Sequence, residues 1–179
     1  MKKIVSLVLA LVLALSLAAC GSKPNTETPD TPNSPEVSTT PEVQEPSFGA
    51  DLTAFYNNML NAAGEAPMMM DMAADPEMLE MTYPGLKDIE TKQLIAVAPM
   101  MSAVAMEFVF VEVANAADVD AVKTILQTRI DNQVAGGAWY PETIEAWKTN
   151  SRVVSNGSCV MMVVSDQADA IVSSFNALF

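Results

Sequence analysis

The clearest strand pattern of hydrophobic positions lies in residues 103–113. Its apolar side chains fall on both faces of an extended chain, as Val104, Met106, Phe108 and Phe110 on one face and Val109, Val111 and Val113 on the other. Two apolar faces predict a central strand. Glu107 and Glu112 interrupt the pattern, and we expect each of them at a place where a face reaches water.

Three further segments read as strands. Residues 92–98 form one of them. Residues 152–155 and 158–165 flank the pair Asn156-Gly157 and predict a β-hairpin, because both residues tolerate the positive φ angles of a tight turn.

Apolar residues at helical spacing predict five helices. Asp51 can cap the first, which Gly64 ends, and Asp75-Pro76-Glu77 begins a short second helix. Asn115 or Asp118 can cap the third, which ends at Gly136-Gly137. A fourth follows Pro141, and Ser165 or Asp166 can cap the last.

The order of these elements predicts one α+β domain over residues 51–179. Consecutive strands that are close in sequence favour an antiparallel sheet of about four strands. We expect the helices to pack mainly on one face of that sheet.

The N-terminus has the pattern of an export signal. Lys2 and Lys3 precede an apolar run over 4–19, which is shorter than the ~18–20 apolar residues of a membrane-spanning helix. Leu17-Ala18-Ala19-Cys20 resembles the lipobox of bacterial lipoproteins, which implies cleavage before Cys20 and a diacylglycerol on its thiol. A plain secreted protein and an uncleaved signal anchor are the alternatives.

Between this leader and the domain, residues 20–50 are expected to form a disordered stalk after the lipidated cysteine. Six of the eleven prolines lie here among Ser, Thr and Glu, and the stretch has little apolar surface to bury. We therefore expect residues 1–19 to be a signal peptide, and the protein to sit on the extracytoplasmic face of the cell membrane, anchored through lipid.

Composition excludes several classes of function. The formal net charge of −13 repels nucleic acid and anionic headgroups, so we expect neither as a partner. The chain has no His, which removes the commonest general base and the commonest transition-metal ligand. With Cys20 modified, Cys159 is left without a cysteine to pair with. We expect no cofactor.

Two residue types still offer chemistry. Cys159 could act as a nucleophile, but it begins an apolar strand and no His can activate it, so a buried structural cysteine is the better interpretation. The cluster Met68, Met69, Met70 and Met72 could hold Cu(I) through soft thioether ligands. It could equally fill the core or form an adaptable apolar contact surface.

Arg129, Gln133 and Tyr140 are candidates for a small polar pocket. Arg129 and Gln133 lie one turn apart on the predicted third helix, and Tyr140 follows shortly after it. A structural role is the alternative, in which Arg129 pairs with Glu142 or Glu145 and Tyr140 fixes the loop.

The order of motifs in residues 90–179 resembles a domain-of-unknown-function family found in small lipoproteins of Gram-positive bacteria. The matching motifs are Asp118-Val119, Arg129 with Gln133, Tyr140-Pro141-Glu142, Asn156-Gly157, the apolar strand through Val164, and Ser165-Asp166. The pair Gly136-Gly137 departs from the more polar run expected there. The resemblance implies fold and location, and no catalytic residue.

Taken together, these features favour a non-enzymatic lipoprotein that binds a protein, a peptide or a cell-envelope component. A metal-handling protein that uses the Met cluster is the alternative. An enzyme of a type without a visible motif is a third possibility.

Overall fold

The computed structural model describes residues 50–63 and 67–179. The predicted signal peptide, Cys20 and the stalk up to residue 49 lie outside this described part. Among the helices that are described, none has both the length and the apolar character needed to cross a membrane.

The described residues form one antiparallel sheet of five strands in the order β1-β2-β3-β5-β4. The strands are β1 Met69–Asp71, β2 Thr91–Pro99, β3 Glu107–Val113, β4 Ser151–Asn156 and β5 Cys159–Val164. The predicted α+β class is confirmed. The additional strand is β1, which pairs with β2 at one edge and places Met70 opposite Ala98.

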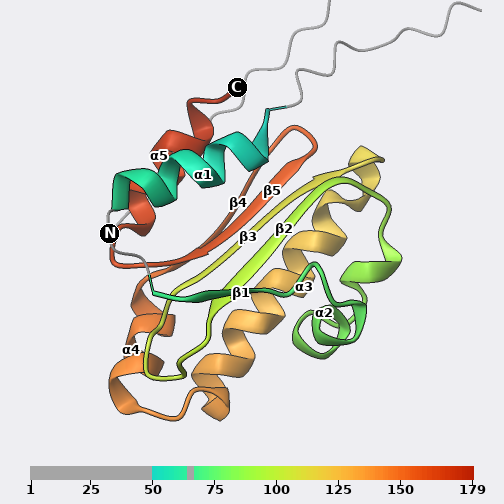
Figure 1. The fold of residues 1–179 in the computed structure, drawn as a ribbon. Coiled ribbons are helices and arrows are strands. Elements are labelled where there is room, and N and C mark those ends of the chain that lie inside the picture. The colour runs from blue at the N-terminus through green and yellow to red at the C-terminus, as the bar shows by residue number, and fades with distance from the viewer. Residues whose placement is uncertain (1–49, 64–66) are drawn as a thin grey trace, which may run out of the picture. The chain divides into compact units, whose positions relative to one another are not determined.

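Helices cover both faces of this sheet in the described part of the chain. The helices are α1 Leu52–Ala63, α2 Pro76–Thr82, α3 Val119–Asn132, α4 Pro141–Thr149 and α5 Ala168–Asn176. Helices α2, α3 and α4 pack on one face, and α1 and α5 pack on the other (Figure 1). The helices are thus shared more evenly between the faces than the sequence suggested.

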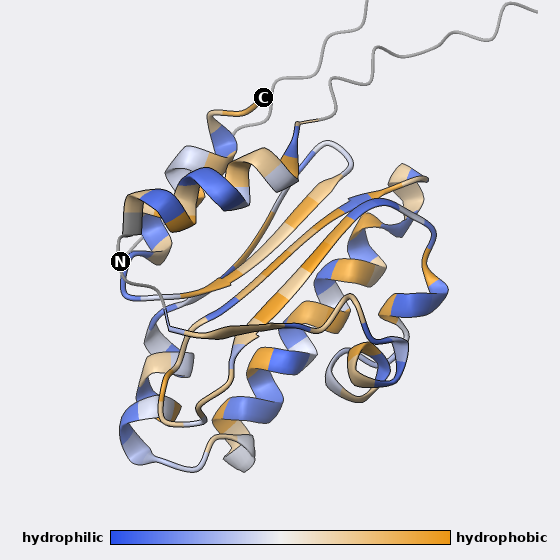
Figure 2. Cartoon of the chain, in the orientation of Figure 1, coloured by the Kyte–Doolittle hydropathy of each residue, from blue (hydrophilic) through white to orange (hydrophobic). Residues whose placement is uncertain are grey.

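Strand β3 is the centre of the fold, as its two apolar faces predicted. Val109 and Val111 contribute to the core beneath α3, whereas Phe108 and Phe110 contribute to the core beneath α1 and α5. The strands are the most continuously hydrophobic part of the molecule (Figure 2). Each face of the sheet is therefore the floor of a separate hydrophobic core.

The expectation that Glu107 and Glu112 face water is wrong, because their side chains are paired inside the protein. Glu107 is 2% exposed and Glu112 is 3% exposed. Gln93 donates a hydrogen bond of 2.6 Å to Glu112 and one of 2.8 Å to the carbonyl of Ala50. The amide of Leu52 donates to Gln93 at 3.0 Å. Glu112 thereby fastens the start of α1 to the sheet.

Side-chain caps set the starts of several helices. Asp75 accepts hydrogen bonds from the amides of Glu77 and Met78 at 2.9 and 3.2 Å, as predicted for α2. The expectation that Ser165 or Asp166 caps α5 is wrong, because the N-cap residue is Gln167 and it makes no side-chain cap hydrogen bond. The hydroxyl of Ser165 instead accepts from the amide of Gln167 at 3.1 Å, just before the helix.

The predicted hairpin between β4 and β5 is present, with its loop one residue further along. Asn156 pairs with Cys159, so the two-residue loop is Gly157-Ser158. Gly157 has a φ of 56°, a left-handed conformation that glycine adopts without steric cost.

Candidate binding site

A pocket of ≈ 320 Å³ lies at one end of the sheet, on the face covered by α3. Its walls come from the β2–β3 connection over 100–106 and from the α3–α4 connection over 133–140. Both connections lie at the lower end of the view in Figure 1. Thus two loops that are distant in sequence enclose one space.

An ion pair between the half-buried Arg129 and the buried Glu107 lies in the lining of this pocket. Arg129 on α3 donates from Nε to one carboxylate oxygen of Glu107 at 2.9 Å and from Nη2 to the other at 2.8 Å. The hydroxyl of Tyr83 donates to the first oxygen at 2.6 Å. Glu107 therefore joins β3 to α3 and to the residue that ends α2, through three hydrogen bonds.

The surroundings of this cluster shift two pKa values. Burial, reinforced by the negative charge and hydrogen bond of Glu107, raises the pKa of Tyr83 well above its usual value. Burial alone would lower the pKa of Arg129, but its hydrogen bonds and ion pair with Glu107 outweigh burial and raise it. Tyr83 is therefore a neutral donor and Arg129 a permanent cation at physiological pH.

Two tryptophans border the pocket in different environments. Trp147 is 5% exposed, and the guanidinium carbon of Arg129 lies 5.3 Å from its ring centroid, which is within cation–π range. Trp139 is 85% exposed. Both tryptophans of the chain therefore line this one pocket.

The glycine pair that ends the third predicted helix shapes the wall beside Trp139. Gly136 has a φ of 127°, which L side chains rarely adopt. A Cβ on Gly137 would lie 2.7 Å from Nε2 of Gln133 and 2.9 Å from the carbonyl oxygen of Asn132. The positive φ of Gly136 and the close contacts at Gly137 explain why two glycines stand here instead of polar residues.

The three residues proposed for a polar pocket have different positions. Arg129 and Gln133 line the pocket, whereas Tyr140 is not among its lining residues. The carbonyl of Tyr140 accepts from the hydroxyl of Thr143 at 2.8 Å, at the start of α4. Its neighbour Trp139 lines the pocket instead. The sequence signal that could have identified Trp139 is its position directly before Tyr140.

Arg129 pairs with a different carboxylate from those considered in the sequence. Its partner is Glu107, 22 residues away. Glu145, one of the alternatives, lies 3.8 Å from Lys148 in an exposed ion pair. The signal that sequence analysis missed is a carboxylate within an otherwise apolar central strand.

The four methionines of the proposed metal cluster lie in different environments. Met68 is 73% exposed and Met72 is 1% exposed. Met69 packs toward the α1/α5 core, whereas Met70 packs toward the α3 core. The pocket is instead lined by methionines from two segments, in and beside β1 and in the β2–β3 connection, and these are Met70, Met72, Met100, Met101 and Met106.

Cys159 is buried within the α1/α5 core, as the structural interpretation requires. Burial, together with the nearby charge of Glu112, raises the pKa of the Cys159 thiol to about 11. The thiol is therefore protonated at neutral pH, and a protonated thiol is a poor nucleophile.

Replacement of Tyr83 by Phe should test the buried cluster. Removal of the hydroxyl takes one hydrogen bond from Glu107, so we expect the free energy of unfolding at pH 7 to fall by about 1.5–3 kcal/mol. Because the pKa of Tyr83 is raised in the folded state, its stabilising contribution is complete below the unfolded value of 10.0 and is lost as pH rises beyond it. The difference between wild type and Tyr83→Phe should therefore narrow above pH 10 in urea unfolding curves.

Tyr140→Phe is the matched control, since Tyr140 is 48% exposed and lies outside the cluster. We expect it to change stability by less than about 0.5 kcal/mol. Equal effects of the two substitutions at pH 7 would show that the Tyr83 hydroxyl does not support Glu107.

Comparison with known proteins places this domain in a family. The family model of the domain of unknown function DUF4358 matches residues 62–165, a span that includes the whole Arg129 pocket. No curated protein and no solved structure matches the chain. Since the match covers more than half of the 179 residues, the protein belongs to the DUF4358 family.

Proposed function

We propose that this protein is a non-enzymatic binding module, anchored to the outer face of a bacterial membrane through lipid on Cys20. Its ligand is a peptide segment of a partner protein, which the Arg129 pocket holds by an apolar side chain. The observation that carries this proposal is the exposure of Trp139, 85%, in the lining of a pocket that also contains the half-buried cation of Arg129.

Exposed apolar side chains surround the opening. Met100 is 61% exposed and Met101 is 60% exposed, and both line the pocket, as Trp139 does. Tryptophan and methionine are enriched at protein interfaces, where tryptophan often dominates the binding energy and methionine adapts to its partner. An apolar side chain of a peptide would cover these groups.

Arg129 offers the pocket a directional hydrogen-bond donor. The Nε and Nη2 atoms of Arg129 are occupied by Glu107, whereas Nη1 has no hydrogen-bond acceptor among the described residues. The side chain is 21% exposed and lines the pocket. Because Glu107 balances its charge, Nη1 is suited to the neutral carbonyl oxygens of a peptide backbone.

The same chemistry favours binding over catalysis. Glu107 already accepts three hydrogen bonds. The raised pKa values of Tyr83 and Cys159 keep both groups protonated near neutral pH. A general base or nucleophile needs a lone pair available at the working pH, and these groups do not provide one.

Replacement of Trp139 by Ala should test peptide binding. We would select peptides on the purified protein from a random display library and measure their affinity by intrinsic fluorescence, to which Trp147 still contributes in the variant. Trp139 is exposed, so its loss should leave folding intact and weaken binding by at least about tenfold.

Met81→Ala is the control, because Met81 is 72% exposed and lines none of the pockets in the described residues. Its affinity for the same peptides should stay within about twofold of wild type. Peptides that bind Trp139→Ala as tightly as wild type would contradict the proposed role of the pocket.

The anchor can be tested separately by Cys20→Ser. The basic residues, apolar run and Leu-Ala-Ala-Cys sequence that support lipidation all lie in the first 20 residues. Loss of the acceptor thiol should move the protein from the membrane fraction to the soluble fraction, because two or more acyl chains give stable anchoring. Cys159→Ser should leave it in the membrane fraction. Unchanged partitioning of Cys20→Ser would contradict the lipid anchor.

Cu(I) binding is the second candidate function, and the thioethers that line the pocket favour it. No group of three or more His, Cys, Asp or Glu residues in the described chain could hold a metal ion, so thioethers would be its ligands. We expect the combined substitution of Met70, Met100 and Met101 by Leu to abolish Cu(I) binding in a competition titration with bicinchoninate.

Leucine preserves volume, so this triple variant should fold. Substitution of the exposed Met68 and Met81 by Leu is the control and should leave the affinity unchanged. An unchanged affinity in the triple variant would exclude a copper site in this pocket.

A further inference from the structure

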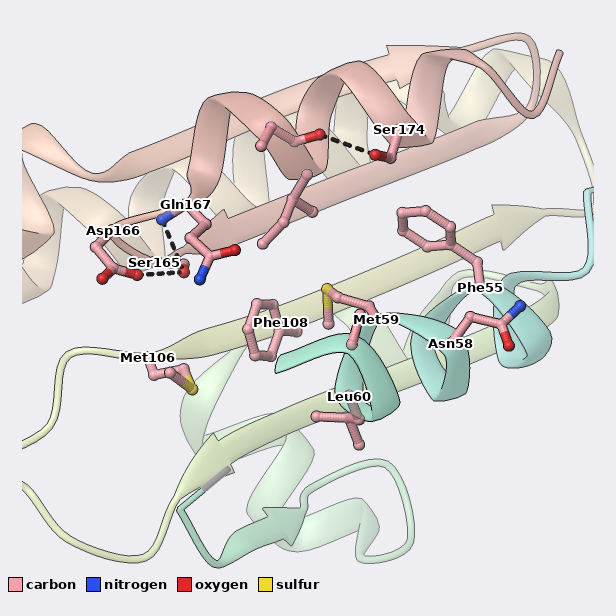
Figure 3. A pocket seen from close by; sticks show the side chains of 13 residues that line it. Phe55, Asn58, Met59, Leu60, Met106, Phe108, Ser165, Asp166, Gln167 and Ser174 are labelled. Atoms are coloured by element: carbon pink, nitrogen blue, oxygen red, sulfur yellow. Dashed lines mark hydrogen bonds between the residues drawn. The ribbon is translucent and has the colours of Figure 1, made fainter. Parts of the chain in front are cut away.

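The opposite face of the sheet carries a second hollow, between α1 and α5. It has a volume of ≈ 500 Å³, within the range of pockets that hold small molecules. Its apolar lining includes Phe55 and Met59 from α1, Phe108 from β3 and Ile171 from α5. Figure 3 shows Phe55, Met59 and Phe108 around the space beneath α5. We refer to this hollow as the α1/α5 groove.

The α1/α5 groove has polar residues toward both ends but its charge at one end only. Ser165, Asp166 and Gln167 lie at one end, whereas Asn58 and Ser174 lie toward Phe55 (Figure 3). The hydroxyl of Ser165 lies 3.3 Å from a carboxylate oxygen of Asp166 and accepts from the amide of Gln167 at 3.1 Å. Asp166 is the single charged residue in the lining, and it is exposed to solvent.

We propose that the α1/α5 groove binds a cationic single-chain amphiphile, with its alkyl chain along the apolar lining and its ammonium head beside Asp166. A flexible chain can follow the elongated space between two helices and removes its methylene groups from water. Charge complementarity selects the head, because a carboxylate or phosphate head would face Asp166 on a protein with a net charge of −13.

The groove is a different site from the proposed peptide pocket. Apart from Met106, different residues line the two spaces. Most of α1 and all of α5 lie outside the residues that match the DUF4358 family, 62–165. Both tryptophans line the pocket on the other face. Met106 lines both spaces, so it is unsuitable for a test of either one.

A displacement titration measures this binding. The Cys20→Ser chain, purified without detergent, would be loaded with the neutral fluorescent probe N-phenyl-1-naphthylamine. Alkyltrimethylammonium ions of 8 to 14 carbons would then displace the probe, at concentrations below micelle formation. We expect about fourfold tighter binding for each added methylene until the groove is filled. Carboxylates of equal chain length should bind at least about tenfold more weakly.

Two variants test separately where the alkyl chain of the amphiphile binds and where its ammonium head binds. Ala170→Phe should fill the groove and lower affinity for probe and ammonium ions by at least about tenfold, because Ala170 is exposed on α5 and lines the groove. Asp166→Asn should leave the affinity for the neutral probe unchanged and abolish the preference for ammonium over carboxylate.

Ala121→Phe is the matched control, since Ala121 is exposed on α3 and lines neither space. It should bind probe and amphiphiles as wild type does. Unchanged affinity in Ala170→Phe would place the alkyl chain elsewhere, and an unchanged head preference in Asp166→Asn would show that Asp166 does not select a cation. Either result would overturn the proposal.

Two further measurements distinguish the groove from the peptide pocket. Amphiphile binding in the groove should persist in Trp139→Ala, and Ala170→Phe should still bind the selected peptides. Loss of amphiphile binding in Trp139→Ala would place the ligand in the Arg129 pocket and overturn the assignment to the groove.

Discussion

The fold is built around a carboxylate that cannot be left without partners. Glu107 lies on the central strand with 2% of its surface exposed, and a charge removed from water to that extent is costly unless it is paired and hydrogen-bonded. Arg129 and Tyr83 meet this need from two different helical segments. Removal of one partner of such a pair typically costs about 3–5 kcal/mol. The same constraint aims Arg129 at the pocket, so the stability of the domain and the polarity of its candidate site have one origin.

Local sequence signals predicted much of this architecture, because they act over a few residues. The alternation through β3, the cap at Asp75 and the turn after Asn156 each depend on neighbouring positions. Glu107 was misjudged since its partner, Arg129, is brought to it only by tertiary packing. The edge strand β1 is three residues long and takes its hydrogen bonds from β2, so its own sequence carries little strand signal. Arg129 was a candidate from sequence, but its pairing with Glu107 in the lining of a pocket required the fold.

The two faces of the sheet differ in how much of their helical covering lies within the residues that match the family. The α3 face and the whole Arg129 pocket fall within the residues that match DUF4358. Helix α5 and most of α1 fall outside them, yet these helices cover Phe108 and Phe110 on the central strand. The second carboxylate of β3, Glu112, reaches α1 through Gln93. Each buried Glu of β3 therefore secures the covering of one face.

Met106 stands where these two faces meet, at the start of β3, and it borders both hollows. A single unbranched thioether has three rotatable bonds and can turn toward either space. If an occupant on one side moves this side chain, the shape presented on the other side changes as well. Thermodynamic linkage then requires the influence to be mutual, so the affinity of each ligand would depend on the concentration of the other.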